Sequence, residues 1–130
     1  MTLRQEVRDW LDSSGYDFET SKIMYDTGRY SYCVFMCHQT IEKLLKAIII
    51  HVNKEIPKKS HNLRELLADC NFEVPADIET KILKLNPHYM FSRYPDIAGG
   101  PSYKMYNKQI AKECMDITEE AVAWLKQKLR

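Results

Sequence analysis

Arg93 is the residue of this chain best suited to bind a phosphate group. It lies in the stretch RYPD, residues 93–96, and His88 precedes it in the sequence. An arginine guanidinium binds phosphate oxygens in pairs, a tyrosine ring stacks on a base, and a histidine transfers protons near neutral pH. We therefore predict a site for a nucleotide or RNA phosphate at Arg93, Tyr94 and Asp96, with His88 as a candidate for proton transfer.

Structural roles for the same residues stay open. Arg93 can tie its loop to Glu42 or Asp96, and Tyr94 can fill a hydrophobic gap. His61, which precedes a predicted helix, can serve as a general base or can cap and pack the loop.

A second polar group repeats at helical spacing within residues 30–52. Its members are Gln39, Glu42, Lys43 and Lys46. They can line a polar groove that faces the Arg93 loop, where Lys43 and Lys46 assist phosphate binding. Alternatively, Glu42 and Lys46 form a favourable pair one helical turn apart on a solvated face.

Apolar residues at helical spacing predict the elements that position these side chains. Gly28 is placed to end the first helix, Asn62 to cap the third and Pro87 to end the fourth. The tyrosine-rich segment 88–107 carries prolines and adjacent glycines, so it is predicted to be irregular. Its Tyr103 and Tyr106 suit either a lid over a ligand or a dimer contact. The predicted helices span residues 2–27, 30–52, 63–70, 75–86 and 107–128. The chain is thus expected to be a single all-α domain, residues 1–130, an up-and-down helical bundle of about five helices, four long and one short.

Composition narrows the possible classes of protein. The chain has 130 residues, 45% of them apolar, and a net charge of +1, which is too balanced for a dedicated nucleic-acid coat. Its start lacks the apolar core of a signal peptide, and its apolar runs are too short to span a bilayer. We expect a cytoplasmic protein that does not contact membranes. The four cysteines, Cys33, Cys37, Cys70 and Cys114, are expected to be reduced core residues, and neither a metal nor a cofactor is expected.

Several stretches together resemble the HEPN family (higher eukaryotes and prokaryotes nucleotide-binding domains). They are the run HQTIEKLLKA of the central helix, SHNLRELL, HYMFSRYPD and AVAWLKQKL, in that order. The resemblance implies a helical bundle that pairs as a homodimer and acts on RNA or nucleotides. It also implies that many relatives are metal-independent RNases, often toxins partnered by a small nucleotidyltransferase antitoxin.

The RNases of this family carry a histidine four to six residues after an arginine. Here the corresponding positions after Arg93 are Ala98, Gly99 and Gly100, none of which can titrate. The RYPD stretch instead resembles a nucleotide-binding branch of the family. We therefore expect a nucleotide- or RNA-phosphate-binding protein, in a toxin–antitoxin-type pair with a nucleotidyltransferase. The alternatives are an endoribonuclease that uses Arg93 with a displaced His88 or His61, and a protein-interaction module without enzymatic activity.

Overall fold

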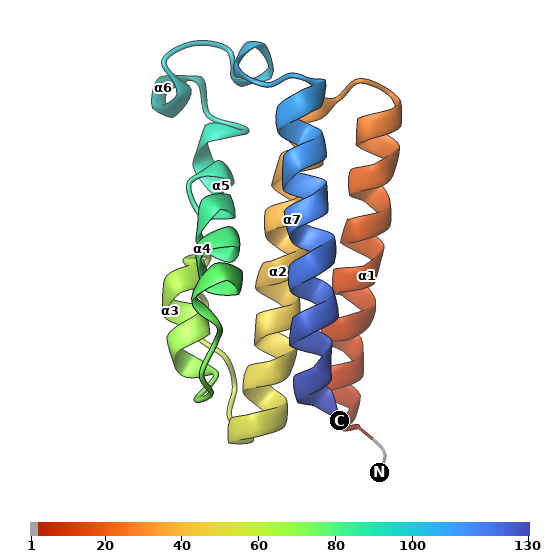
Figure 1. Ribbon diagram of the computed structural model, residues 1–130, viewed down its shortest axis with the longest axis vertical. Coiled ribbons are helices and arrows are strands. Elements are labelled where there is room, and N and C mark those ends of the chain that lie inside the picture. The colour runs from red at the N-terminus through yellow and green to blue at the C-terminus, as the bar shows by residue number, and fades with distance from the viewer. Residues whose placement is uncertain (1–2) are drawn as a thin grey trace.

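The computed structural model describes residues 3–130, and this part of the chain contains helices and no strand. Helices α1 (Gln5–Asp26) and α2 (Tyr30–Asn53) run antiparallel, and α7 (Lys108–Lys126) packs along α2 (Figure 1). Helices α3 (Leu63–Asp69) and α4 (Ala76–Leu85) lie on the other side of α2. The prediction of an all-α bundle is confirmed.

The tight turn between α1 and α2 follows from one glycine. Gly28 adopts φ +78°, a left-handed conformation that costs a residue with a Cβ about 1–2 kcal/mol. Its N–H donates to the carbonyl of Tyr25, and the N–H of Arg29 donates to that of Met24, which together form a Schellman motif. Helix α1 continues unbroken through Gly15. The predicted start of this helix at Thr2 lies outside the described residues.

The predicted helix boundaries around α3 and α4 are also present. The Asn62 side chain accepts hydrogen bonds from the backbone of Arg64 and Glu65, as a helix cap does. In a capping box the Glu65 carboxylate would accept directly from the N–H of Asn62. Here the Ser60 hydroxyl lies between them, because it donates to the Glu65 carboxylate and accepts from the N–H of Asn62. Helix α4 ends at Leu85, just before Pro87.

The segment predicted to be irregular contains short helices. They are α5 (His88–Phe91), α6 (Pro95–Ala98) and the 3-10 turn η1 (Ser102–Met105). Pro95 occupies the first position of α6, where its fixed φ and missing N–H fit a helix start, and Gly99 ends it with φ +79°. A single turn has too few residues to display helical periodicity, which is why the sequence did not reveal it.

The core is built on one face of α2. Cys33, Cys37, Ile41, Leu44 and Ile48 are completely buried there against α3, α4 and α7. All four cysteines are buried and free, and burial raises the pKa of Cys70 and of Cys114 to about 12. Among the described residues, no helix is both long enough and apolar enough to cross a membrane.

Candidate functional site

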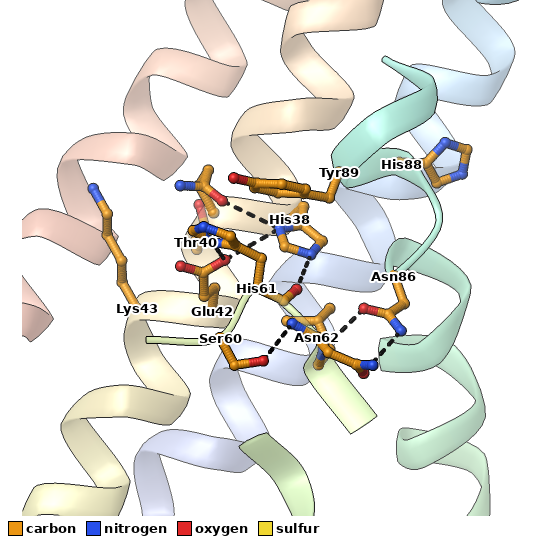
Figure 2. A network of polar contacts seen from close by, with 12 residues as sticks. His38, Thr40, Glu42, Lys43, Ser60, His61, Asn62, Asn86, His88 and Tyr89 are labelled. Atoms are coloured by element: carbon orange, nitrogen blue, oxygen red, sulfur yellow. Dashed lines mark hydrogen bonds and ion pairs between the residues drawn. The ribbon is translucent and has the colours of Figure 1, made fainter. Parts of the chain in front are cut away.

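Glu42 is the centre of a buried polar cluster on α2. Glu42 is only 3% exposed. Its carboxylate accepts a hydrogen bond from His61 Nδ1 at 2.9 Å (Figure 2) and another from Lys46 Nζ at 3.1 Å. Lys46 is 6% exposed and lies 5.4 Å from the centre of the Trp10 ring of α1. The alternative in which Glu42 and Lys46 pair on a solvated face is therefore wrong, because α1 and the loop before α3 cover both.

His38 extends this cluster into the core. Its Nε2 lies 3.1 Å from the carbonyl oxygen of His61, and its Nδ1 lies 3.2 Å from the Gln39 side-chain oxygen and 3.8 Å from Glu42. Burial lowers the pKa of His38, although the Glu42 charge opposes that change. The contact of His38 with the His61 carbonyl holds the loop that carries His61 against α2.

The ring of Tyr89, on α5, connects His61 to Arg93. The Tyr89 and His61 rings stack with centroids 4.2 Å apart, as Figure 2 shows. The Arg93 guanidinium lies 4.6 Å from the centre of the Tyr89 ring, 4.2 Å from that of Phe35 and 4.8 Å from that of Tyr94. The structure thus brings one histidine and one arginine of the predicted site onto a single aromatic ring.

Arg93 is held by its own helical turn and not by an acid. Its Nε and one terminal nitrogen donate to the carbonyl oxygen of Tyr89, at 3.1 and 3.0 Å. The predicted clamp to Glu42 or Asp96 is absent among the described contacts. Because a guanidinium has five N–H donors, three remain for a ligand.

Two predicted site residues lie apart from this arrangement. The Lys43 ammonium contacts Asp17 and Ser13 of α1, each at 2.8 Å, and is thus bound by α1. His88 points away from the His61 cluster in Figure 2, and its Nδ1 lies 2.6 Å from the Tyr106 hydroxyl. Burial lowers the pKa of His88.

A pocket of about 450 Å³ adjoins Arg93 at the start of α2. Arg29 and Arg93 both line it, and none of its lining residues is acidic. The N-terminus of α2 lies here without a side-chain cap and without an acidic residue in its first turn. Its first N–H groups have no acceptor within the helix, and the positive end of the helix dipole favours an anion. Ser102, another lining residue, is buried, and its hydroxyl lacks a hydrogen-bond partner among the described residues.

Sequence reasoning missed four residues of this region: His38, Tyr89, Arg29 and Ser102. Arg29 carried a usable signal, since it is a basic residue directly before an apolar helix that has no acidic first turn. Ser102 carried none, because its position depends on how η1 folds back toward α2. No group of three or more His, Cys, Asp or Glu side chains in the described part of the chain is placed to hold a metal ion.

Two of the comparisons with known proteins name the same family. The model of the HEPN domain matches residues 7–128. A protein of Methanocaldococcus jannaschii named as a suspected toxin, MJ1304, is 25% identical over 126 residues, which cover 88% of this chain and 82% of that protein. The crystal structure of TT1696 from Thermus thermophilus has a TM-score of 0.86 and 28% identity, covering 97% of this chain and all of that one. The crystal structure of ST0689, an archaeal HEPN homologue, has a TM-score of 0.80 and 28% identity, covering 98% of this chain and all of that one.

Proposed function

The chain belongs to the HEPN domain family, and on that premise we propose that it binds a nucleotide or an RNA phosphate in the pocket between Arg29 and Arg93. One observation carries the proposal: two arginine residues and the uncapped N-terminus of α2 line one pocket that has no acidic lining residue. Each of these features attracts an anion, and together they match the oxygens of a phosphate.

Aromatic side chains around the pocket suit the rest of a nucleotide. Tyr32 and Tyr103 line the pocket and are exposed, as is Tyr94 beside Arg93. Exposed tyrosines offer flat faces on which a base can stack while its phosphate binds the arginines. Of the other predicted site residues, Gln39 contacts His38, and Glu42 binds both Lys46 and His61. The His61 ring stacks on Tyr89, which contacts Arg93. Gln39, Glu42 and Lys46 are positioning residues in this proposal.

Calorimetric titration with AMP, ATP and a ten-nucleotide uridine RNA tests the proposal. Arg29→Ala is the sharper variant, because Arg93 also packs three aromatic rings and its loss can loosen the fold. Arg64, exposed at the start of α3 and outside this pocket, gives the matched control Arg64→Ala. A charged hydrogen bond contributes about 1.5–3 kcal/mol, so Arg29→Ala should weaken binding roughly 10- to 100-fold. Equal affinities for wild type, Arg29→Ala and Arg64→Ala would refute this site.

A second candidate function is metal-independent cleavage of RNA by His61 and Arg93. The observation in its favour is the contact of both residues with the Tyr89 ring, together with the hydrogen bond from His61 Nδ1 to Glu42. Glu42 orients the imidazole, so that Nε2 can take the proton of a ribose 2′-hydroxyl as its oxygen attacks the phosphate. Arg93 stabilises the phosphorane, and the bond from phosphorus to the 5′-oxygen breaks as water protonates that oxygen. His88 is less suited to this role, because it points away and contacts Tyr106.

Cleavage of a mixed RNA substrate distinguishes this second candidate. His61→Ala and Arg93→Ala should each abolish cleavage, and His88→Ala should retain it. Cleavage that survives all three changes would come from a contaminating nuclease and would exclude this mechanism.

Self-association and a protein partner complete the proposal. Tyr16, Ile23 and Tyr32 expose apolar surface on α1 and α2, and a groove there shares Arg29 and Tyr32 with the phosphate pocket. A homodimer through this face would place the second copy beside the bound phosphate. Light scattering after gel filtration should give a dimer for wild type and a monomer for Ile23→Glu. The name of the relative MJ1304 supports a toxin–antitoxin-type pair. We propose a small nucleotidyltransferase as the partner in such a pair.

A further inference from the structure

A second pocket lies at the opposite end of α2 from Arg93. It has a volume of about 410 Å³ and is bounded by the start of α1, the end of α2 and the loop 54–59. Trp10, Lys46 and Ile50 form its inner part, whereas Lys54, Lys58, Lys59 and Arg4 come from its exposed margin. In Figure 1 the end of α2 and the start of α1 lie together at one end of the bundle, and α6 lies at the other. This second pocket is therefore separate from the proposed phosphate site.

A buried ammonium group stands at the inner end of the second pocket. Lys46 donates to Glu42 at 3.1 Å, and this is the only acceptor that the described residues provide for its three N–H groups. Its other neighbour is the Trp10 ring, whose π face attracts the cation without accepting a conventional hydrogen bond. Because Lys46 also lines the pocket, its unused donors favour a ligand with a negatively charged oxygen.

The margin of the second pocket is basic although the whole chain is nearly neutral. Five lining residues are basic and two, Glu6 and Glu55, are acidic, whereas the chain as a whole has a net charge of +1. Glu6 pairs with Arg4 and Asp69 pairs with Lys58. Lys59 has no acidic partner among the described residues, and Lys54 contacts only the carbonyl oxygen of His51. The excess positive charge attracts an acidic ligand.

Ile56 indicates that the ligand is a protein segment. Its side chain is 94% exposed on the loop 54–59 and lines the pocket beside Pro57. An apolar side chain presented among lysines contributes to binding only if the ligand also brings apolar surface to cover it. RNA would satisfy the lysines through its phosphates, which bring no apolar surface to Ile56, and a small anion inside the pocket would not reach across the loop.

We propose that the second pocket docks an acidic peptide segment of a partner protein, with one bulky apolar side chain of the segment inserted against Trp10 and Ile50. Acidic side chains of the segment pair with Lys54 and Lys59, one carboxylate or carbonyl oxygen reaches Lys46, and the segment covers Ile56. This inference concerns protein recognition and does not depend on phosphate binding at Arg29 and Arg93.

Selection from a library of random displayed dodecapeptides against the full chain tests this proposal. Selected peptides are expected to be acidic and to carry a bulky apolar residue. Their affinities are then measured by fluorescence anisotropy against two variants that leave the core intact. Ile56→Ser removes the apolar contact, and Lys54→Asn with Lys59→Glu removes the charges; asparagine suits the left-handed conformation of Lys54 (φ 58°). Ile97→Ser and Lys84→Glu are exposed controls outside the second pocket.

The proposal predicts that peptide binding weakens at least tenfold in each of the two pocket variants. It also predicts unchanged binding in both controls and in Arg29→Ala. Selection without enrichment would overturn it, as would enriched peptides that bind Ile56→Ser as tightly as wild type. A uridine decamer gives a further test. If it displaces the peptides and binds wild type and Ile56→Ser equally, the proposal is overturned, because the surface then recognises RNA by charge alone.

Discussion

Replacing Glu42 with alanine is expected to lower the free energy of unfolding by about 3–5 kcal/mol. The change removes the acceptor of both Lys46 and His61 and leaves the Lys46 ammonium buried without a counter-ion. Breaking a buried pair in this way costs far more than breaking an exposed one, because water solvates the nearly buried charge that remains only poorly. Since a domain of this size is stable by about 5–15 kcal/mol in total, the loss would be a large fraction.

Urea denaturation at neutral pH, followed by circular dichroism, measures this loss. The chain provides a matched control in Lys112 and Asp116, which are also spaced one turn apart on a helix but are 57% and 59% exposed. Asp116→Ala should cost about 0.5 kcal/mol or less. In a second control, Lys46→Met added to Glu42→Ala should recover most of the lost stability, because no unpaired charge then stays buried.

Two results would refute this reasoning. If Glu42→Ala costs no more than Asp116→Ala, the cluster is not the buried centre that the distances describe. If the double variant with Lys46→Met is no more stable than Glu42→Ala, the loss comes from packing and not from an uncompensated charge.

Two further predictions concern protonation and backbone conformation. Burial lowers the pKa of His38 from 6.5, so its contribution to stability should be complete above that value and should be lost as the pH falls toward the folded-state pKa. Denaturation curves between pH 8 and 5 check this, and a His38→Asn variant with the same slope over that range would contradict it. Gly15 and Gly28 both have open space where a Cβ would stand, but only Gly28 has a positive φ. Gly15→Ala should stabilise the chain by about 0.5–1 kcal/mol and Gly28→Ala should destabilise it by about 1–2 kcal/mol. Thermal unfolding that shifts in the same direction for both would disprove the conformational argument.

Local signals were sufficient to place the main helices. Gly28, Asn62 and Pro87 mark helix ends through properties of their own backbone or side chain, and those ends occur where they were predicted. Helical periodicity likewise identified the buried face of α2, because the spacing of apolar residues repeats over many turns. One-turn helices such as α5 and α6 have no repeat to detect.

The pair Glu42 and Lys46 shows the limit of such signals. A spacing of one turn is the same on a buried face and on a solvated face, so the sequence left both alternatives open. Burial was decided by Trp10 of α1 and by His61 of the loop before α3, which reach the pair from distant parts of the chain. Lys43 is their neighbour in sequence, yet it contacts Asp17 of α1.

The sequence by itself determined which segments form the longer helices, which face of α2 is apolar and that Arg93 could bind a phosphate. Only the tertiary structure decided that Arg29 joins Arg93 in one pocket and that His61 shares the Tyr89 ring with Arg93. The reason is physical: helical spacing fixes the direction of a side chain around its own helix axis. The convergence of side chains from α2, α5 and the loops depends instead on how the helices pack, which is set by contacts between residues far apart in the chain.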